Sequence, residues 1–174
     1  MDRKILLGVT GSIAAYKAVE LVRLFSAAGD DVTVLMTPAA REFVTPLTFR
    51  TLSRNPVYSD QFAAPSEWKP EHVALADAAD LAVVAPATAN TIAKLRFGMA
   101  DNLLLATLLA TRAPLVIAPA MNTGMWRNPA TRENVAALEA RGVRIAGPRE
   151  GELACGDSGA GRMLEPKEIF ALCG

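Results

Sequence analysis

The sequence predicts an α/β fold in which a parallel sheet is covered by helices on both faces. Short apolar runs alternate along the chain with longer segments of helical periodicity. The apolar runs are continuous, which is typical of strands that are buried on both faces. The 174 residues contain no internal repeat, low-complexity tract or linker, so we expect one domain spanning residues 1–174.

The N-terminal part of the chain predicts a strand over residues 5–9 and a helix over residues 13–28. Four apolar residues at the spacing i, i+3, i+4 and i+7 give this helix one face for burial: Ala18, Leu21, Val22 and Phe25. Ser12 is placed to cap the start of the helix, and Gly29 is placed to end it.

The middle of the chain predicts a second strand over residues 32–36 and a third over residues 81–84. Helical segments separate these two strands at residues 39–44, 46–54 and 72–79. Thr45 is a suitable N-cap, and Pro46 then occupies the first helical position. Residues 55–71 are rich in proline, serine, aspartate and aromatic residues, which indicates a long loop.

The second half of the chain continues the alternation. Further strands are expected at residues 115–118 and 143–145. Further helices are expected at residues 90–96, 102–111, 129–141 and 165–172. Residues 147–161 hold five glycines and predict a second loop.

Composition excludes several classes of function. Eighteen basic and eighteen acidic residues give no electrostatic drive toward nucleic acid or an anionic membrane. The longest uncharged stretch, residues 113–126, is too short to span a membrane, and no export signal is expected at the start. Two cysteines make no disulfide framework, so a cytoplasmic location is expected.

The apolar content of 51% is high for such a chain. It predicts either a large core, or a subunit interface together with a pocket for a flat apolar ligand. The excess is concentrated around residues 103–109, 115–118 and 121–126. We expect part of this surface to be covered by neighbouring subunits.

Ligands of parallel sheets bind at the carboxyl ends of the strands, so the residues that follow each strand matter most. Gly11 permits a tight turn, after which the helix N-terminus can face an anion, although the turn is neither GxGxxG nor a P-loop. After the third strand, Thr88, Asn90 and Thr91 suit a phosphate monoester. The same three residues could instead be a capping cluster.

The segment after the fourth strand, residues 119–126, contains Asn122 between apolar residues. Its amide can hold a carboxylate or a carbonyl, whereas a plain hydrophobic turn is the alternative. His72 is the single histidine and a candidate acid or base near neutral pH, although lone histidines are more often structural. Cys155 lies in the glycine-rich loop, either as a proton donor on a lid or as an incidental thiol. No metal site is expected.

Together these segments resemble the flavin-containing cysteine decarboxylase superfamily, and within it the phosphopantothenoylcysteine decarboxylases of coenzyme A synthesis. Residues 86–91 are similar to the family's flavin-binding PASANT segment, with Thr88 in place of serine. Residues 119–126 match PxMNxxMW, and residues 154–162 match the substrate-clamp loop. The chain departs from the family at Ala78, where an aromatic residue is frequent.

The resemblance implies a flavodoxin-like (Rossmann-type) three-layer sandwich that binds FMN. It further implies a homotrimer or a dodecamer of trimers, with active sites between subunits, and a C-terminal ligase domain in many relatives. The implied cofactor-binding residues are Gly11, Ser12, Ile13, Thr37, Thr88, Asn90, Thr91 and Ala120. The implied substrate-binding residues are Asn122, Met125, Ala154 and Gly156. By position, His72 is the base, Asn122 holds the substrate carboxylate and Cys155 donates the final proton.

The implied reaction converts 4′-phosphopantothenoylcysteine to 4′-phosphopantetheine. The cysteine nitrogen of this substrate is acylated and cannot form an imine with pyridoxal phosphate. Flavin can oxidise the CH₂–SH group to a thioaldehyde, which accepts electrons as CO₂ leaves, and can then reduce the resulting enethiol. The alternatives are a peptidyl-cysteine decarboxylase, a flavin prenyltransferase or a non-catalytic FMN-binding regulatory subunit.

Overall fold

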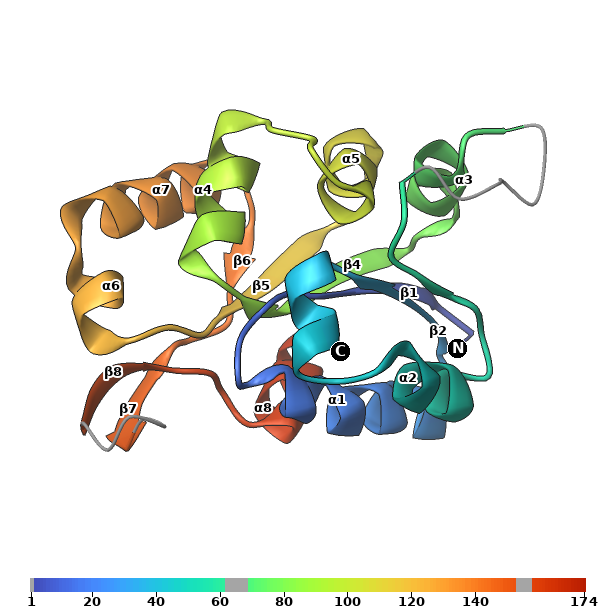
Figure 1. Ribbon diagram of the computed structural model, residues 1–174, viewed down its shortest axis with the longest axis horizontal. Helices are drawn as coiled ribbons and strands as arrows, with labels where there is room; N and C mark the ends of the chain where they lie inside the picture. Colours follow the sequence, from blue (N-terminus) through green and yellow to red (C-terminus); the bar gives the residue numbers. More distant parts are fainter. Residues whose placement is uncertain (1, 62–68, 153–157) are drawn as a thin grey trace.

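A six-stranded parallel sheet forms the centre of the protein (Figure 1). The computed structural model describes residues 2–61, 69–152 and 158–174. The strand order is β3-β2-β1-β4-β5-β6, and every pairing in this sheet is parallel. The strands are β1 (Lys4–Val9), β2 (Asp31–Met36), β3 (Val57–Tyr58), β4 (Leu81–Ala87), β5 (Leu115–Pro119) and β6 (Arg144–Ile145).

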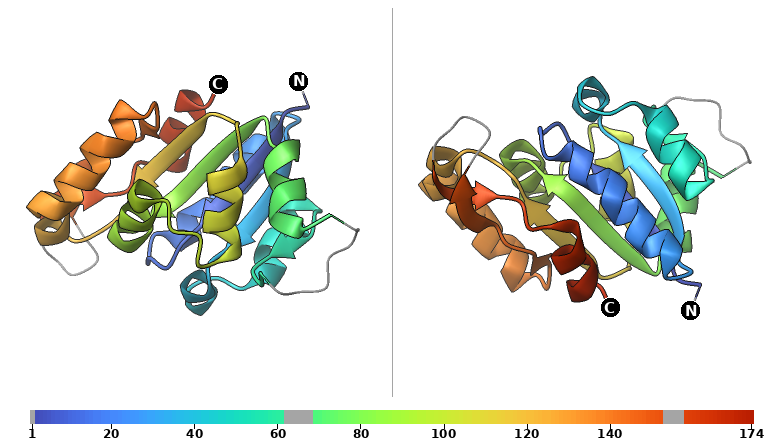
Figure 2. Two further views of the ribbon diagram at one scale, coloured as in Figure 1. Left: turned by 90° about the horizontal axis from the view of Figure 1, so that it is seen from above. Right: turned by 90° about the horizontal axis from the view of Figure 1, so that it is seen from below.

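Helices cover both faces of the sheet, which confirms the predicted three-layer, flavodoxin-like fold (Figures 1 and 2). One face carries α1 (Ala15–Ala27), α2 (Pro46–Ser53) and α8 (Pro166–Leu172). The other carries α3 (Glu71–Ala78), α4 (Ala89–Phe97), α5 (Leu103–Ala110) and α7 (Pro129–Ala140). Two shorter helices, η1 (Pro38–Glu42) and α6 (Thr123–Arg127), follow β2 and β5.

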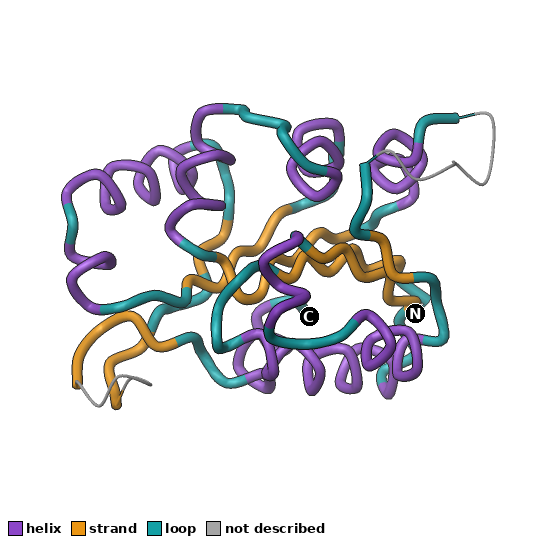
Figure 3. Tube along the Cα trace, viewed as in Figure 1, coloured by secondary structure: helices purple, strands orange, loops and turns teal. Residues whose placement is uncertain are grey.

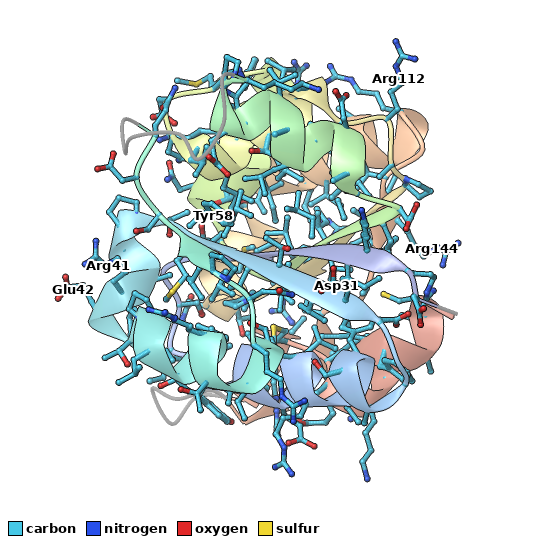
Figure 4. The ribbon with its side chains drawn as sticks, turned by 90° about the vertical axis from the view of Figure 1, so that its right-hand side faces the viewer. Asp31, Arg41, Glu42, Tyr58, Arg112 and Arg144 are labelled. Carbon is cyan, nitrogen blue, oxygen red and sulfur yellow. The ribbon has the colours of Figure 1, made fainter. Side chains whose placement is uncertain are left out.

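Two apolar cores lie on opposite sides of the sheet, because successive side chains of a strand point to opposite faces. In β1, Ile5 and Leu7 join the core beneath α1, whereas Leu6 joins the core beneath α5. All seven residues of β4 are buried, which explains why its sequence is a continuous apolar run. Charged side chains such as Arg41 and Arg112 project outward from the layers (Figure 4).

Helix α1 follows its predicted pattern, since the four apolar residues at helical spacing are all buried. The helix begins at Ala15 rather than at residue 13, and its N-cap Ala14 makes no side-chain capping bond. The predicted cap was therefore wrong: the hydroxyl of Ser12 accepts a hydrogen bond from the N–H of Ala14 ahead of the helix (3.2 Å). Gly29, with φ of +86°, ends the helix as predicted.

Two predicted loops contain strands (Figure 3). Residues 55–71 include β3, which pairs with β2 through two residues only and is too short to give a periodic signal. Residues 147–161 include β7 (Arg149–Glu152), which pairs with β8 (Ser158–Arg162) as an antiparallel hairpin. Neither hairpin strand carries large apolar residues, so the sequence gives no strand pattern there.

The two ends of the chain lie side by side near the amino ends of the strands (Figure 2). The guanidinium of Arg3 binds both carboxylate oxygens of Asp30 (3.1 and 2.8 Å) and also donates to the carbonyl oxygen of Cys173 (2.6 Å). Cys173 is buried, and this burial raises the pKa of its thiol to about 11. None of the helices in the described parts of the chain has the length and apolar character needed to cross a membrane.

Candidate active site

A cavity of about 610 Å³ opens at the carboxyl ends of β1, β4 and β5. This is where ligands bind in sheets of this topology, and the volume is in the range of small-molecule sites. The cavity is lined by Gly11, Ser12, Ile13, Ala14, Tyr16, Lys17, Thr88, Ala89, Ala120, Met121, Asn122, Met125, Gly161, Arg162 and Met163. Seven predicted site residues therefore share one cavity.

Thr10 joins the ends of β1 and β4 at the base of the cavity. Its buried hydroxyl donates to the carbonyl oxygen of Pro86 (2.7 Å) and accepts from the N–H of Thr88 (3.2 Å). Beside it, a Cβ at Gly11 would lie 2.5 Å from the Cβ of Ala39, so only glycine fits. A tight turn was the predicted reason for Gly11, and close packing against η1 also requires glycine there.

The N-terminus of α4 faces the cavity through Thr88 and Ala89. The hydroxyl of Thr88 caps the helix by accepting from the N–H of Thr91 (3.2 Å), and it also contacts the Thr91 hydroxyl (3.0 Å). The capping interpretation is thus confirmed for this pair. The cap also holds the positive end of α4 against the cavity, which favours an anion there.

The loop after β5 supplies an apolar wall and one amide. Asn122 caps α6, because its Oδ1 accepts from the N–H of Gly124 (2.7 Å). This bond fixes the orientation of the amide, whose nitrogen is the group that can donate to a carboxylate. The N–H of Met121 donates to the carbonyl oxygen of Gly161 (3.0 Å) and so ties this loop to β8.

The β8 side of the cavity is basic. Lys17 is 7% exposed, and its ammonium donates to the carboxylate of Glu165 (2.9 Å) and to the carbonyl oxygen of Met163 (3.3 Å). Arg162 binds the same carboxylate oxygen (3.0 Å). The hydrogen bond from Lys17 is the main cause that lowers the pKa of Glu165 below its ordinary value.

Lys17 was not predicted as a cavity residue, and Arg162 entered the sequence analysis only as the last residue of the clamp-loop match, without a role. The signal for Lys17 was present: it stands four residues before Leu21, on the buried face of α1. A lysine in that position must pair with a carboxylate or face a cavity, because an isolated buried ammonium is costly. The contact of Arg162 with Glu165 could not be predicted, since the hairpin that carries Arg162 was not predicted.

Four predicted site residues do not line the cavity. Thr37 is buried and caps η1 by accepting from the N–H of Ala40 (3.3 Å). Thr91 is buried behind Thr88, and Asn90 is exposed. His72 is half-buried in the first turn of α3, which packs against α5 on the face of the sheet opposite α1.

The predicted residues Ala154, Cys155 and Gly156 lie outside the described residues. In the parts of the chain that the structure describes, no three His, Cys, Asp or Glu side chains gather closely enough to hold a metal ion. The described site therefore combines helix N-termini, hydroxyl groups, one oriented amide, two cations and an apolar wall. Such a set can hold a flat apolar ligand that carries phosphate.

The chain belongs to the Flavoprotein family, which it matches over residues 1–173. Within that family it is similar to phosphopantothenoylcysteine decarboxylases, as the sequence analysis expected. A probable phosphopantothenoylcysteine decarboxylase of Streptococcus mutans is 47% identical over 172 residues, covering 98% of this chain and 96% of that protein.

A second relative is longer. The coenzyme A biosynthesis bifunctional protein CoaBC of Vibrio vulnificus is 50% identical over 171 residues, which are 98% of this chain but 43% of that protein. The chain thus spans less than half the length of this bifunctional relative.

Two solved structures share the fold over almost the whole chain. A PPC decarboxylase mutant complexed with pantothenoylaminoethenethiol superposes with a TM-score of 0.90 at 32% identity, covering 99% of this chain and 97% of that one. SpaF, an FMN-dependent cysteine decarboxylase, superposes with a TM-score of 0.83 at 32% identity, covering 99% and 98%.

Proposed function

We propose that this chain catalyses the FMN-dependent decarboxylation of 4′-phosphopantothenoylcysteine to 4′-phosphopantetheine in coenzyme A synthesis. The observation that carries the proposal is the cavity in which Asn122, the α4 N-terminus and β8 meet. Similarity to a probable phosphopantothenoylcysteine decarboxylase along nearly the full length of both chains supports it. The reaction acts on a free thiol, so we assign it to the reducing cytoplasm.

The residues of the cavity fit FMN. Ser12, Thr88 and the N-terminal N–H groups of α4 are hydrogen-bond donors suited to a phosphate monoester. Ile13, Ala120 and Met121 give an apolar surface for a flat ring. Thr37 and Thr91 act behind this surface by holding the turns that carry it, and Asn90 lies at its exposed edge.

Few groups act on the substrate. When bound, FMN supplies a reversible two-electron acceptor for the CH₂–SH group. Asn122 donates through its amide nitrogen to the substrate carboxylate and orients the bond that breaks as CO₂ leaves. Met125 covers the substrate from the same loop. We assign the last proton transfer to Cys155, flanked by Ala154 and Gly156.

We assign proton removal from the thiol to His72 of a neighbouring copy. Within one protomer, His72 lies on α3, beyond the cavity-lining residues. The cavity also has an exposed apolar rim: Ile13 is 57% exposed, Tyr16 61% and Met125 49%. A second copy that covers this rim and supplies His72 accounts for both features. A homotrimer, or a dodecamer of trimers, provides such interfaces.

The decisive experiment measures cofactor and product together. The purified protein is expected to show a flavin spectrum and to release CO₂ from 4′-phosphopantothenoylcysteine. Cys155→Ser is expected to release CO₂ but accumulate the enethiol, whereas Cys173→Ala, at the buried cysteine, yields normal product. A colourless protein that cannot be reconstituted with FMN overturns the proposal. Normal 4′-phosphopantetheine yields from Cys155→Ser remove that cysteine from the mechanism.

The origin of His72 is tested by complementation. His72→Asn is expected to keep flavin and lose the first oxidation, and Asn122→Ala is expected to lose turnover. Co-expression of the two inactive chains restores activity in about a quarter of the sites if each site joins two subunits that mix at random. No recovery shows that both groups act within one chain. Normal turnover by His72→Asn removes the histidine from the reaction.

The bifunctional relative suggests a further arrangement. We propose that, in a longer protein, a C-terminal ligase domain supplies phosphopantothenoylcysteine to this decarboxylase. The C-terminal helix α8 ends beside the N-terminus, near the amino ends of the strands (Figure 2). Expression of residues 1–174 alone separates the two activities, because CO₂ release then depends on added phosphopantothenoylcysteine and not on added cysteine.

A further inference from the structure

Two cations of the cavity share a single carboxylate. The ammonium of Lys17 and the guanidinium of Arg162 both bind Oε1 of Glu165, at 2.9 and 3.0 Å. Lys17 is almost fully buried, whereas the side chain of Arg162 is 43% exposed toward the cavity side of β8. The backbone of Glu165 is fixed by Glu168, because its N–H donates to the Glu168 carboxylate (2.9 Å) and its carbonyl oxygen accepts from the Glu168 N–H (2.9 Å). Two cations therefore share one oxygen of a carboxylate that is held in place.

This arrangement leaves an excess positive charge at the cavity wall. Lys17 and Arg162 share the carboxylate of Glu165, while the neighbouring carboxylate of Glu168 pairs with Arg149. One cation is enough to neutralise the carboxylate of Glu165, so ion pairing within the protein does not account for the second cation at the cavity. A buried lysine that faces a ligand cavity is accounted for if an anion enters that cavity.

Lys17 and Arg162 form a basic wall of the cavity, and this basic wall is separate from the anion site at α4. Lys17 and Glu165 lie with α1 and α8 on one face of the sheet, whereas Thr88 caps α4 on the other face. The proposed cofactor and the proposed substrate each carry one phosphate monoester. Because Thr88, Ser12 and the α4 N-terminus already suit the cofactor's phosphate, the basic wall is left for the second one.

We propose that Lys17 and Arg162 form the subsite for the phosphate monoester of the substrate, and that Glu165 holds both cations in place. The inference rests on the proposed function and adds the source of its selectivity for a phosphorylated substrate. Lys17 supplies a fixed ammonium on a rigid helix. Arg162 supplies a planar guanidinium that binds two phosphate oxygens at once, and its partial exposure lets it follow the ligand.

The first test compares ligands that differ by the phosphate alone. Calorimetry of the FMN-loaded protein with 4′-phosphopantetheine and with pantetheine measures the preference without turnover. We expect a preference of about 100-fold in the unmodified protein, reduced by about 10-fold or more in Arg162→Gln. Lys167→Gln, at an exposed lysine of α8 outside the cavity, serves as the matched control and keeps the full preference.

Lys17→Gln gives a second, independent measurement. Since it removes a partner of Glu165, thermal unfolding is recorded beside the calorimetry. If Lys17 has only a structural role, Lys17→Gln lowers the unfolding temperature and weakens the binding of both ligands equally. If Lys17 binds the phosphate, Lys17→Gln weakens the binding of 4′-phosphopantetheine by about 10-fold or more and leaves the binding of pantetheine unchanged. Equal weakening of the two ligands, seen in both Lys17→Gln and Arg162→Gln, overturns the subsite.

The cofactor is tested as the other source of phosphate. Apo-protein is titrated with FMN and with riboflavin, which lacks the phosphate. If Arg162→Gln weakens FMN but not riboflavin, the cations bind the cofactor's phosphate and the inference is wrong. Unchanged affinity for both flavins, with a lost preference for 4′-phosphopantetheine, supports the inference.

Different outcomes contradict the subsite and the proposed function. Release of CO₂ at equal kcat/KM from phosphorylated and dephosphorylated substrate preserves the function and overturns the subsite. Absence of CO₂ release from either substrate overturns the function. In that case, a phosphate preference that disappears in Arg162→Gln still establishes an anion site at these two cations.

Discussion

Gly161 is the position at which one added methyl group is expected to open the site. It lies in β8 with φ of +139°, and a Cβ there would lie 2.2 Å from the carbonyl oxygen of Met121. Real Cβ contacts essentially never fall below 3.0 Å, so β8 must move by at least 0.8 Å in Gly161→Ala. The obstacle is backbone, which cannot rotate away as a side chain can.

The free-energy cost of Gly161→Ala has two contributions. A non-glycine residue at this φ carries about 1–3 kcal/mol of backbone strain. The shift also breaks the hydrogen bond from the N–H of Met121 to the carbonyl oxygen of Gly161 (3.0 Å), which contributes about 1 kcal/mol. We therefore expect a local loss of about 2–4 kcal/mol, which lowers the population of the docked hairpin by about 30-fold or more.

Hydrogen exchange reads this loss directly. The amide of Met121 is protected by the bond that the substitution breaks, so its exchange is expected to accelerate by about 30-fold or more. Affinity for 4′-phosphopantetheine is expected to fall as well, because Asn122 and Arg162 line the cavity on either side of this bond. The β1 amides, in the centre of the sheet, are expected to exchange as before.

Gly142→Ala is the matched control. Gly142 also has a positive φ, +88°, but a Cβ there meets nothing within 4 Å. It is expected to lower the free energy of unfolding by about 1 kcal/mol without a selective effect on Met121. If the Met121 amide remains as protected in Gly161→Ala as in Gly142→Ala, the reasoning about the backbone contact is wrong.

Three further predictions concern stability and reactivity. Phe25→Ala is expected to lower the free energy of unfolding by about 3–5 kcal/mol in urea titrations, because Phe25 is fully buried. In a Cys155→Ser background, Cys173 is expected to resist iodoacetamide at pH 8 until the protein unfolds, since burial raises its thiol pKa to about 11. Folding lowers the pKa of Glu165, so this residue stabilises the folded protein at pH above its ordinary pKa of 4.5. The stabilisation is lost as the pH falls through the pKa of the folded state. Glu165→Gln is therefore expected to flatten the fall of unfolding temperature in acid.

The fold could be predicted because most of its strands are buried on both faces. Strands such as β4 and the buried face of α1 consist of apolar residues at a spacing that identifies the element. The elements that escaped prediction have no such pattern. Strand β3 pairs through two residues, and the β7–β8 hairpin consists of charged and small residues that are held by backbone bonds and by close contact with the β5–α6 loop.

The site could be predicted only where one segment contributes both the motif and the contact. Thr88 and Asn122 follow strands directly, so the carboxyl-end rule places them correctly. The cluster of Lys17, Arg162 and Glu165 joins α1 to residues almost 150 positions later. No local spacing encodes such a contact, because it depends on how α8 and β8 return to α1.

The apolar excess is distributed differently from what the sequence suggested. Part of the apolar surface around residues 103–109 was expected to be covered by neighbouring subunits. In this stretch Leu103, Leu104 and Leu105 are buried within the protomer, and Leu109 is the large residue left exposed. Two cores on either side of a central sheet need more apolar residues than a single core, which is consistent with the high apolar content of 51%.

Three of the large apolar residues that remain exposed line the cavity. Ile13, Tyr16 and Met125 line the cavity and stay about half exposed within one protomer. Their substitution should therefore change association and ligand retention while leaving the unfolding of the protomer unaltered, whereas substitutions in the two cores do the reverse. Stability and assembly are thus carried by different apolar residues, and only the second set is coupled to the cavity.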